Sequence, residues 1–294
     1  MHIWAETNPF RRGLSDELLH DLEEGPCATV FLACVKTGLD VRLRADAVNL
    51  YFGGRSMARI VGRKLFPHRL EIHPKYVSAG RIGAFVGRPS GSYLVFDVTA
   101  GFADAYAAEL PGLMLKASEH VGHEENVELR LLQRNDGTSD VCCFDRQVQV
   151  PGTRRTIDIV GLTLKNAPVL VAMEVKCYPD NRIQHVPRQL HEYLEILDPD
   201  RKGLRDDVAE SYRTVCRQLR RLGRPAPDPG RITPGMLVKG LVVVSDYDPR
   251  SNLLPRAQRL AAKLERPIYL WESESGEFAV PPPARWRQMG QVGA

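Results

Sequence analysis

The chain lacks several features that would assign it to a class at once. Its 294 residues contain no run of about 18 apolar residues, the length that a membrane-spanning helix needs. The N-terminus lacks the basic and then apolar order of a signal peptide, and the six cysteines include no Cys-x-x-Cys pair. No Gly-x-x-x-x-Gly-Lys-Ser/Thr loop occurs, which excludes an ATP-driven motor of that type. We therefore expect a cytoplasmic protein with reduced thiols and no membrane partner.

The chain also has little net charge, although its charged residues are unevenly distributed. The 40 basic and 36 acidic residues give a net charge of +4, which says little about nucleic acids. Residues 201–231 hold nine basic and four acidic residues, a local excess of five positive charges. Arg213, Arg217 and Arg220 recur at helical spacing within this segment, so we predict that they bind nucleic-acid phosphates. The alternative is an ordinary solvated helix face.

The part of the chain up to about residue 100 is mainly β in pattern. Apolar and polar residues alternate in several short runs, and Gly53-Gly54 between two of them is typical of a hairpin turn. Arg55 after this turn is either a second nucleic-acid contact or part of an ordinary exposed turn. We predict one helix at 16–24, followed by strands at 39–43, 48–52, 56–61, 69–73 and 93–98.

The pattern becomes helical from residue 102 to about residue 134, with a break predicted at Pro111. Strands then alternate with helices. We predict strands at 141–150, 156–164, 168–176, 237–245 and 268–271, a Pro-Gly turn at 151–152, and helices at 187–197, 207–222 and 253–265. This order implies a mixed sheet with parallel members covered by helices. The predicted class is α/β (α+β), with a mainly antiparallel domain at 1–100 and a mixed-sheet domain at 101–294.

Charged residues end the apolar strand predicted at 168–176. Both faces of this strand are apolar, which indicates an interior strand, yet Glu174 and Lys176 stand side by side on one face. Asp158 lies at the edge of an apolar face on the preceding strand. An isolated buried charge costs several kcal/mol unless it is paired or bound to a metal.

Two carboxylates on adjacent strands can converge on one cation. Hard oxygen ligands suit Mg²⁺ or Mn²⁺, and a neighbouring lysine can serve the attacking water and offset negative charge on a phosphorane-like transition state. The alternative is a simple ion pair at the end of a strand.

Three features follow one another along the chain: Asp158 in Ile-Asp-Ile-Val-Gly, then Glu-Val-Lys at 174–176, then a helix carrying Gln189. Together they resemble the PD-(D/E)xK nuclease superfamily, over residues 118–272. Ile157 stands where the superfamily name has a proline. The resemblance implies a restriction-endonuclease-like fold, with Asp158 and Glu174 as metal ligands. It also implies that the backbone carbonyl of Val175 completes the metal shell, that Lys176 is the catalytic lysine, and that Gln189 lies close to the active site.

A glutamate on the helix upstream belongs to the same pattern. Glu124, Glu125 and Glu128 are all candidates, and we favour Glu124 because it shares a face with Val127 and Leu131.

The resemblance implies a hydrolase that cuts DNA with Mg²⁺ or Mn²⁺, and RNA is not excluded as a substrate. Stand-alone bacterial nucleases of this kind act in repair, restriction or phage defence. One alternative is a catalytically inactive module that binds nucleic acid or a protein partner. Another is an effector-gated nuclease with the N-terminal domain as sensor. That domain could also recognise substrate or form a homodimer, and the sequence does not choose among these.

Overall fold

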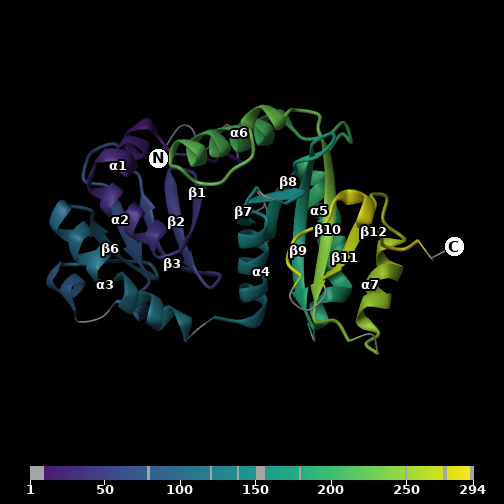
Figure 1. Cartoon of the computed structure of the whole chain (residues 1–294), viewed down its shortest axis with the longest axis horizontal. Helices are drawn as coiled ribbons and strands as arrows, with labels where there is room; N and C mark the ends of the chain where they lie inside the picture. Colours follow the sequence, from purple (N-terminus) through teal and green to yellow (C-terminus); the bar gives the residue numbers. More distant parts are fainter. Residues whose placement is uncertain are drawn as a thin grey trace. The chain divides into compact units, whose positions relative to one another are not determined.

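The computed structural model describes residues 10–77, 80–119, 121–137, 139–149, 156–178, 180–248, 250–273 and 277–291. It is a mixed α/β fold with two six-stranded sheets, one antiparallel and one mixed, as predicted. The chain divides into two compact units (Figure 1). One comprises Arg12–Asn126 with Arg221–Gly223, and the other comprises mainly Val127–Arg220 and the residues from Arg224 onward.

The N-terminal unit contains an antiparallel sheet of order β1-β2-β3-β4-β6-β5. Its strands are β1 (Asp40–Arg44), β2 (Ala47–Phe52), β3 (Arg55–Val61), β4 (Arg69–Ile72), β5 (Arg88–Ser90) and β6 (Tyr93–Asp97). Its helices are α1 (Asp16–Glu24), α2 (Pro26–Lys36) and α3 (Ala100–Ser118). The five predicted strands and the first helix are confirmed. Gly53 and Gly54 have φ of 51° and 83°, the left-handed backbone that the predicted hairpin turn requires.

Three features of this unit differ from the predictions, and the first is the three-residue strand β5, which was not predicted. Helix α2 was missed because it is apolar nearly all round, with no polar stripe to mark a helical period. The predicted break at Pro111 is wrong: α3 continues through this residue and buries apolar side chains on both sides of it. Because α3 packs on α2, it belongs with the N-terminal unit. The division between the units therefore falls after Asn126, about one helix later than the boundary predicted near residue 100.

The C-terminal unit contains the mixed sheet, of order β12-β11-β10-β9-β8-β7. Its strands are β7 (Val141–Gln149), β8 (Thr156–Thr163), β9 (Val169–Cys177), β10 (Leu237–Ser245), β11 (Ile268–Ser273) and β12 (Arg287–Gln288). Strands β9, β10 and β11 are parallel, and the remaining pairs are antiparallel. The predicted strands are confirmed. The predicted turn at 151–152 and residue 150 lie outside the described residues.

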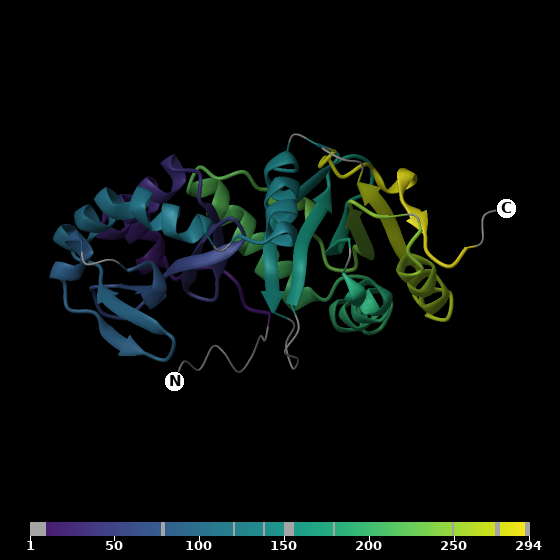
Figure 2. The same ribbon diagram turned by 90° about the horizontal axis from the view of Figure 1, so that it is seen from below.

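Helices cover both faces of the mixed sheet. Helix α4 (His123–Arg134) packs on one face, and α5 (Val186–Leu197), α6 (Asp206–Arg221) and α7 (Leu253–Ala261) pack on the other. Figure 2 shows α4 on one side of the strands and α5, seen nearly end-on, on the other. The division between the units falls within α4, after Asn126, although the helix is continuous. Within the described part of the chain, no helix is both long and apolar enough to cross a bilayer.

Candidate metal centre

The central strand β9 carries charged residues into the interior. All nine of its residues are buried, and Glu174 and Lys176 expose only 1% and 5% of their surface. Asp158, near the start of the adjacent β8, exposes 8%. Such burial is costly unless the charges are paired or bind a cation, so these three residues need partners.

The register of β8 and β9 brings the three residues together. Ile159 pairs with Met173, so Asp158 lies beside the Glu174 end of β9. The ammonium of Lys176 is 3.4 Å from Asp158 Oδ2 and 3.6 Å from Glu174 Oε2. The backbone N–H of Val175 donates to Asp158 Oδ2 at 3.0 Å. The convergence that the sequence pattern predicted is therefore present, with one ammonium shared by two carboxylates.

The backbone carbonyl of Val175, predicted to complete a metal shell, has a partner within the chain. It accepts a hydrogen bond from Lys176 Nζ at 2.6 Å. This bond fixes the end of the lysine side chain beside both carboxylates.

Helix α4 adds further carboxylates to this cluster. Glu124, Glu128 and Asp158 each offer an oxygen within 4.8 Å of the others. Glu125 instead pairs with Arg55, at 3.0 Å. Of the three helix glutamates that the sequence left open, the structure thus brings two, Glu124 and Glu128, to Asp158.

Two residues of β7 were missed in the sequence. Arg146 is fully buried and forms an ion pair with Glu128. Gln147 donates to Glu128 Oε2 at 3.3 Å and to Asp158 Oδ1 at 3.4 Å. The strand is irregular between Cys143 and Asp145, and Gln147 has a φ of 47°, so simple alternation does not give the direction of these side chains. A charged residue inside a mainly apolar strand was the signal that could have identified Arg146.

The electrostatics of the cluster are those of residues that could hold a cation. Burial and the charge of Asp158 raise the pKa of Glu174 well above its ordinary value, although Lys176 opposes the shift. Glu174 Oε1 has no hydrogen-bond partner among the described residues, although it is buried. Since carboxylate oxygens are the ligands that Mg²⁺ and Mn²⁺ prefer, these residues fit such an ion.

Gln189 connects to the same region through a tyrosine. Its side-chain N–H donates to the hydroxyl of Tyr193 at 2.5 Å, and this hydroxyl donates to the backbone carbonyl of Thr156 at 2.8 Å. Thr156 precedes Asp158 by two residues on β8. Gln189 is thus fixed on α5 near the start of the strand that carries Asp158.

The predicted arginine stripe lies on α6 but is partly engaged there. Arg213 and Arg217 both pair with Glu210, at 2.7 Å and 2.9 Å. Arg213 also donates to the carbonyl of Ile232. Arg220 is exposed at the next turn. This arrangement resembles the solvated helix face that was the alternative, with Arg220 as the residue most available to a phosphate.

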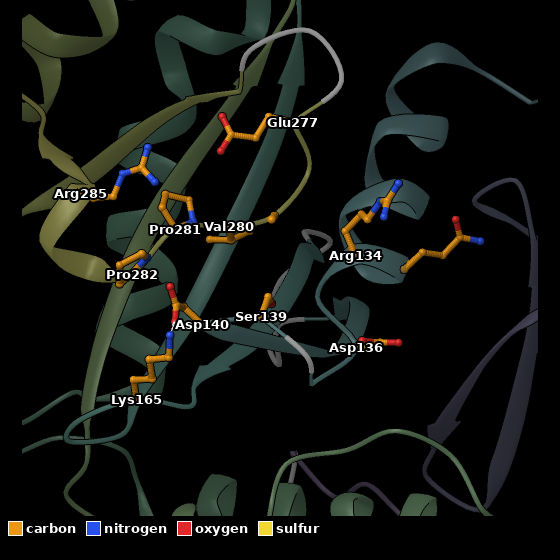
Figure 3. A pocket seen from close by; sticks show the side chains of 12 residues that line it. Arg134, Asp136, Ser139, Asp140, Lys165, Glu277, Val280, Pro281, Pro282 and Arg285 are labelled. Carbon is orange, nitrogen blue, oxygen red and sulfur yellow. Dashed lines mark ion pairs between the residues drawn. The ribbon is translucent and has the colours of Figure 1, made fainter.

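An open groove of about 650 Å³ lies at the other end of β7 and β8 (Figure 3). It is lined by residues of both charges, and Lys165 points at Asp140, 2.6 Å away. Lys165 follows the end of β8, whereas Asp158 lies near its start, which separates the groove from the carboxylate cluster by roughly 20 Å. The groove therefore adds nothing to the cluster.

No family model, no curated protein and no solved structure matches this chain. The function must be inferred from the geometry of the carboxylate cluster itself.

Proposed function

We propose that the C-terminal unit is a divalent-metal-dependent nuclease that hydrolyses phosphodiester bonds of DNA. The observation that carries the proposal is the convergence of Asp158, Glu174 and Lys176 at the end of a buried strand. One buried oxygen of Glu174 has no hydrogen-bond partner among the described residues.

Asp158 and Glu174 would hold Mg²⁺ or Mn²⁺. Such an ion polarises a phosphoryl oxygen and lowers the pKa of a water molecule. Lys176 orients the attacking water and offsets the negative charge that develops on the phosphoryl group. The Val175 N–H and the Gln147 amide hold Asp158 in place. Gln189, fixed by Tyr193, would position the water or the substrate strand.

One observation favours a second function for the same fold. Glu174 and Lys176 are almost completely buried, and Asp158 and the half-buried Glu124 leave the cluster only partly open. A binding module without catalysis would retain the same residues as a buried ion-paired group.

The test incubates the full chain with plasmid DNA, single-stranded DNA and RNA, with Mg²⁺ or with Mn²⁺. Glu174→Ala and Lys176→Ala are the test variants. Lys165→Ala is the matched control, because Lys165 is also a lysine paired with an aspartate but lies at the other end of the strands.

We expect metal-dependent cutting that both test variants lose and the control keeps. Binding without cutting, under every metal, would support the module instead. Cutting that appears only after a small molecule is added would indicate effector gating. Cutting that survives in both test variants would refute the proposed site.

A further inference from the structure

The buried guanidinium of Arg146 forms an ion pair with one carboxylate of the cluster. Arg146 pairs with Glu128, and the two side chains expose 0% and 3% of their surface. Glu128 Oε2 also accepts a hydrogen bond from the Gln147 amide. A buried positive charge therefore lies directly against the negative charge of Glu128.

The negative charges of the other two buried carboxylates, Asp158 and Glu174, are compensated in another way. Asp158 and Glu174 share the single ammonium of Lys176, at 3.4 Å and 3.6 Å. Glu174 Oε1 is buried with no hydrogen-bond partner among the described residues. A divalent cation gains most where negative charge is buried and least compensated, which is beside Asp158 and Glu174.

A second cation beside Glu128 would meet an opposing charge. It would lie close to the Arg146 guanidinium in a site with little water, where repulsion between like charges is strong. An arginine keeps its proton at all accessible pH values, so it cannot lose its charge to make room.

We propose that Arg146 is a built-in counter-charge for Glu128, so that the cluster takes one divalent ion, held by Asp158 and Glu174. Glu128 is then a positioning residue. It holds the Gln147 amide, and this amide holds Asp158. The inference rests on the proposed function only in requiring that a divalent ion binds.

The experiment counts Mn²⁺ ions per chain by titration calorimetry and by electron paramagnetic resonance of free Mn²⁺, with no nucleic acid present. Wild type should bind one ion. Glu128→Gln should still bind one ion, about tenfold more weakly, as expected for a residue that orients a ligand. Asp158→Asn and Glu174→Gln should each reduce the affinity by more than about a hundredfold.

Variants of Arg146 test the counter-charge directly. Arg146→Met frees the Glu128 carboxylate, and we expect a second Mn²⁺ to bind. If the uncompensated buried charge of Glu128 prevents this variant from folding, the charge-balanced double variant Arg146→Met/Glu128→Gln should fold and bind one ion. A double variant that folds but binds two ions would overturn the inference.

The outcomes separate the two proposals. Two ions in wild type, or no ion in Glu128→Gln, would overturn the inference and leave metal-dependent cutting possible. No ion in wild type would overturn both. One ion in wild type, with no cutting of any nucleic acid, would support the inference and refute the nuclease.

Discussion

The two sheets of this protein have the same number of strands, but strand β3 of one and strand β9 of the other place their charged residues differently. Strand β3 of the antiparallel sheet has buried, intermediate and exposed residues, and its Arg59 pairs with Glu71 at a partly exposed position. Strand β9 of the mixed sheet buries all nine residues, including a glutamate and a lysine.

The partly exposed pair on β3 is typical of a structural ion pair, whereas the buried charges on β9 are typical of a functional site. A partly exposed ion pair contributes little to stability and costs little to form. Buried charges cost several kcal/mol each, and they persist where geometry and function compensate for the cost. Substitutions in the two sheets or units, most of them in matched pairs, therefore test this difference.

The largest expected effect concerns the glutamates of the two sheets. Glu174→Gln removes the buried carboxylate that would hold the ion, so metal-dependent cleavage should fall by about a thousandfold or more. Glu71→Gln alters a carboxylate of similar size on β4 and should leave cleavage unchanged. Initial rates on plasmid DNA with Mn²⁺ measure both. Equal losses in the two variants would remove the distinction between the sheets.

The second effect concerns the arginines that form ion pairs in the two sheets, Arg146 and Arg59. Arg146→Met leaves Glu128 buried without its cation and should lower the free energy of unfolding by about 3–5 kcal/mol. Arg59→Met breaks a partly exposed pair and should cost less than about 1 kcal/mol. Urea denaturation of the metal-free protein measures both values. A loss below about 1 kcal/mol for Arg146→Met would contradict the buried pair.

The third effect is a pH dependence of the metal-free protein. The pKa of Glu174 is raised in the folded state above its ordinary value of 4.5. The stability contributed by this protonation is complete below the unfolded value and is lost as pH rises through the folded pKa. As the pH rises, the free energy of unfolding of wild type should therefore fall relative to that of Glu174→Gln. Urea midpoints of both proteins between pH 5 and 8 measure the difference, and parallel curves would contradict it.

Metal binding should favour the deprotonated form of Glu174 instead of the protonated one. An ion binds the deprotonated carboxylate, so wild type should release protons on binding Mn²⁺ at a pH below the raised pKa. Calorimetry in buffers of different ionisation enthalpy counts these protons. Glu71→Gln should release as many protons as wild type, because its carboxylate is not in the cluster.

The smallest effect concerns DNA binding by arginines of the two units. Arg220 is exposed on α6, and Arg220→Ala should reduce the slope of log Kd against log salt by about one. Arg55 pairs with Glu125, so the Arg55→Ala substitution should leave this slope unchanged. Fluorescence anisotropy with a labelled duplex measures both slopes. The reverse result would assign the phosphate contact to the hairpin turn of the N-terminal unit.

Much of the fold could be predicted from the sequence, because it depends on local patterns. Alternating residues predicted the strands, and the Gly53-Gly54 turn follows from the conformational freedom of glycine. Helix α2 and the path of α3 through Pro111 were not readable, because burial against other elements overrides local preference there. The two-residue strand β12 carries too short a pattern to be recognised.

Side-chain direction alternates with a period of two along a strand, and this local rule is enough to place Asp158, Glu174 and Lys176 at the ends of two neighbouring apolar strands. The positions of Arg146 and Gln147 beside them, and the approach of Glu124 and Glu128, but not Glu125, to Asp158, follow from folding alone. These contacts depend on an irregular strand and on the rotation of a helix over a sheet. Neither is fixed by periodicity along the chain, because both arise from packing between distant segments.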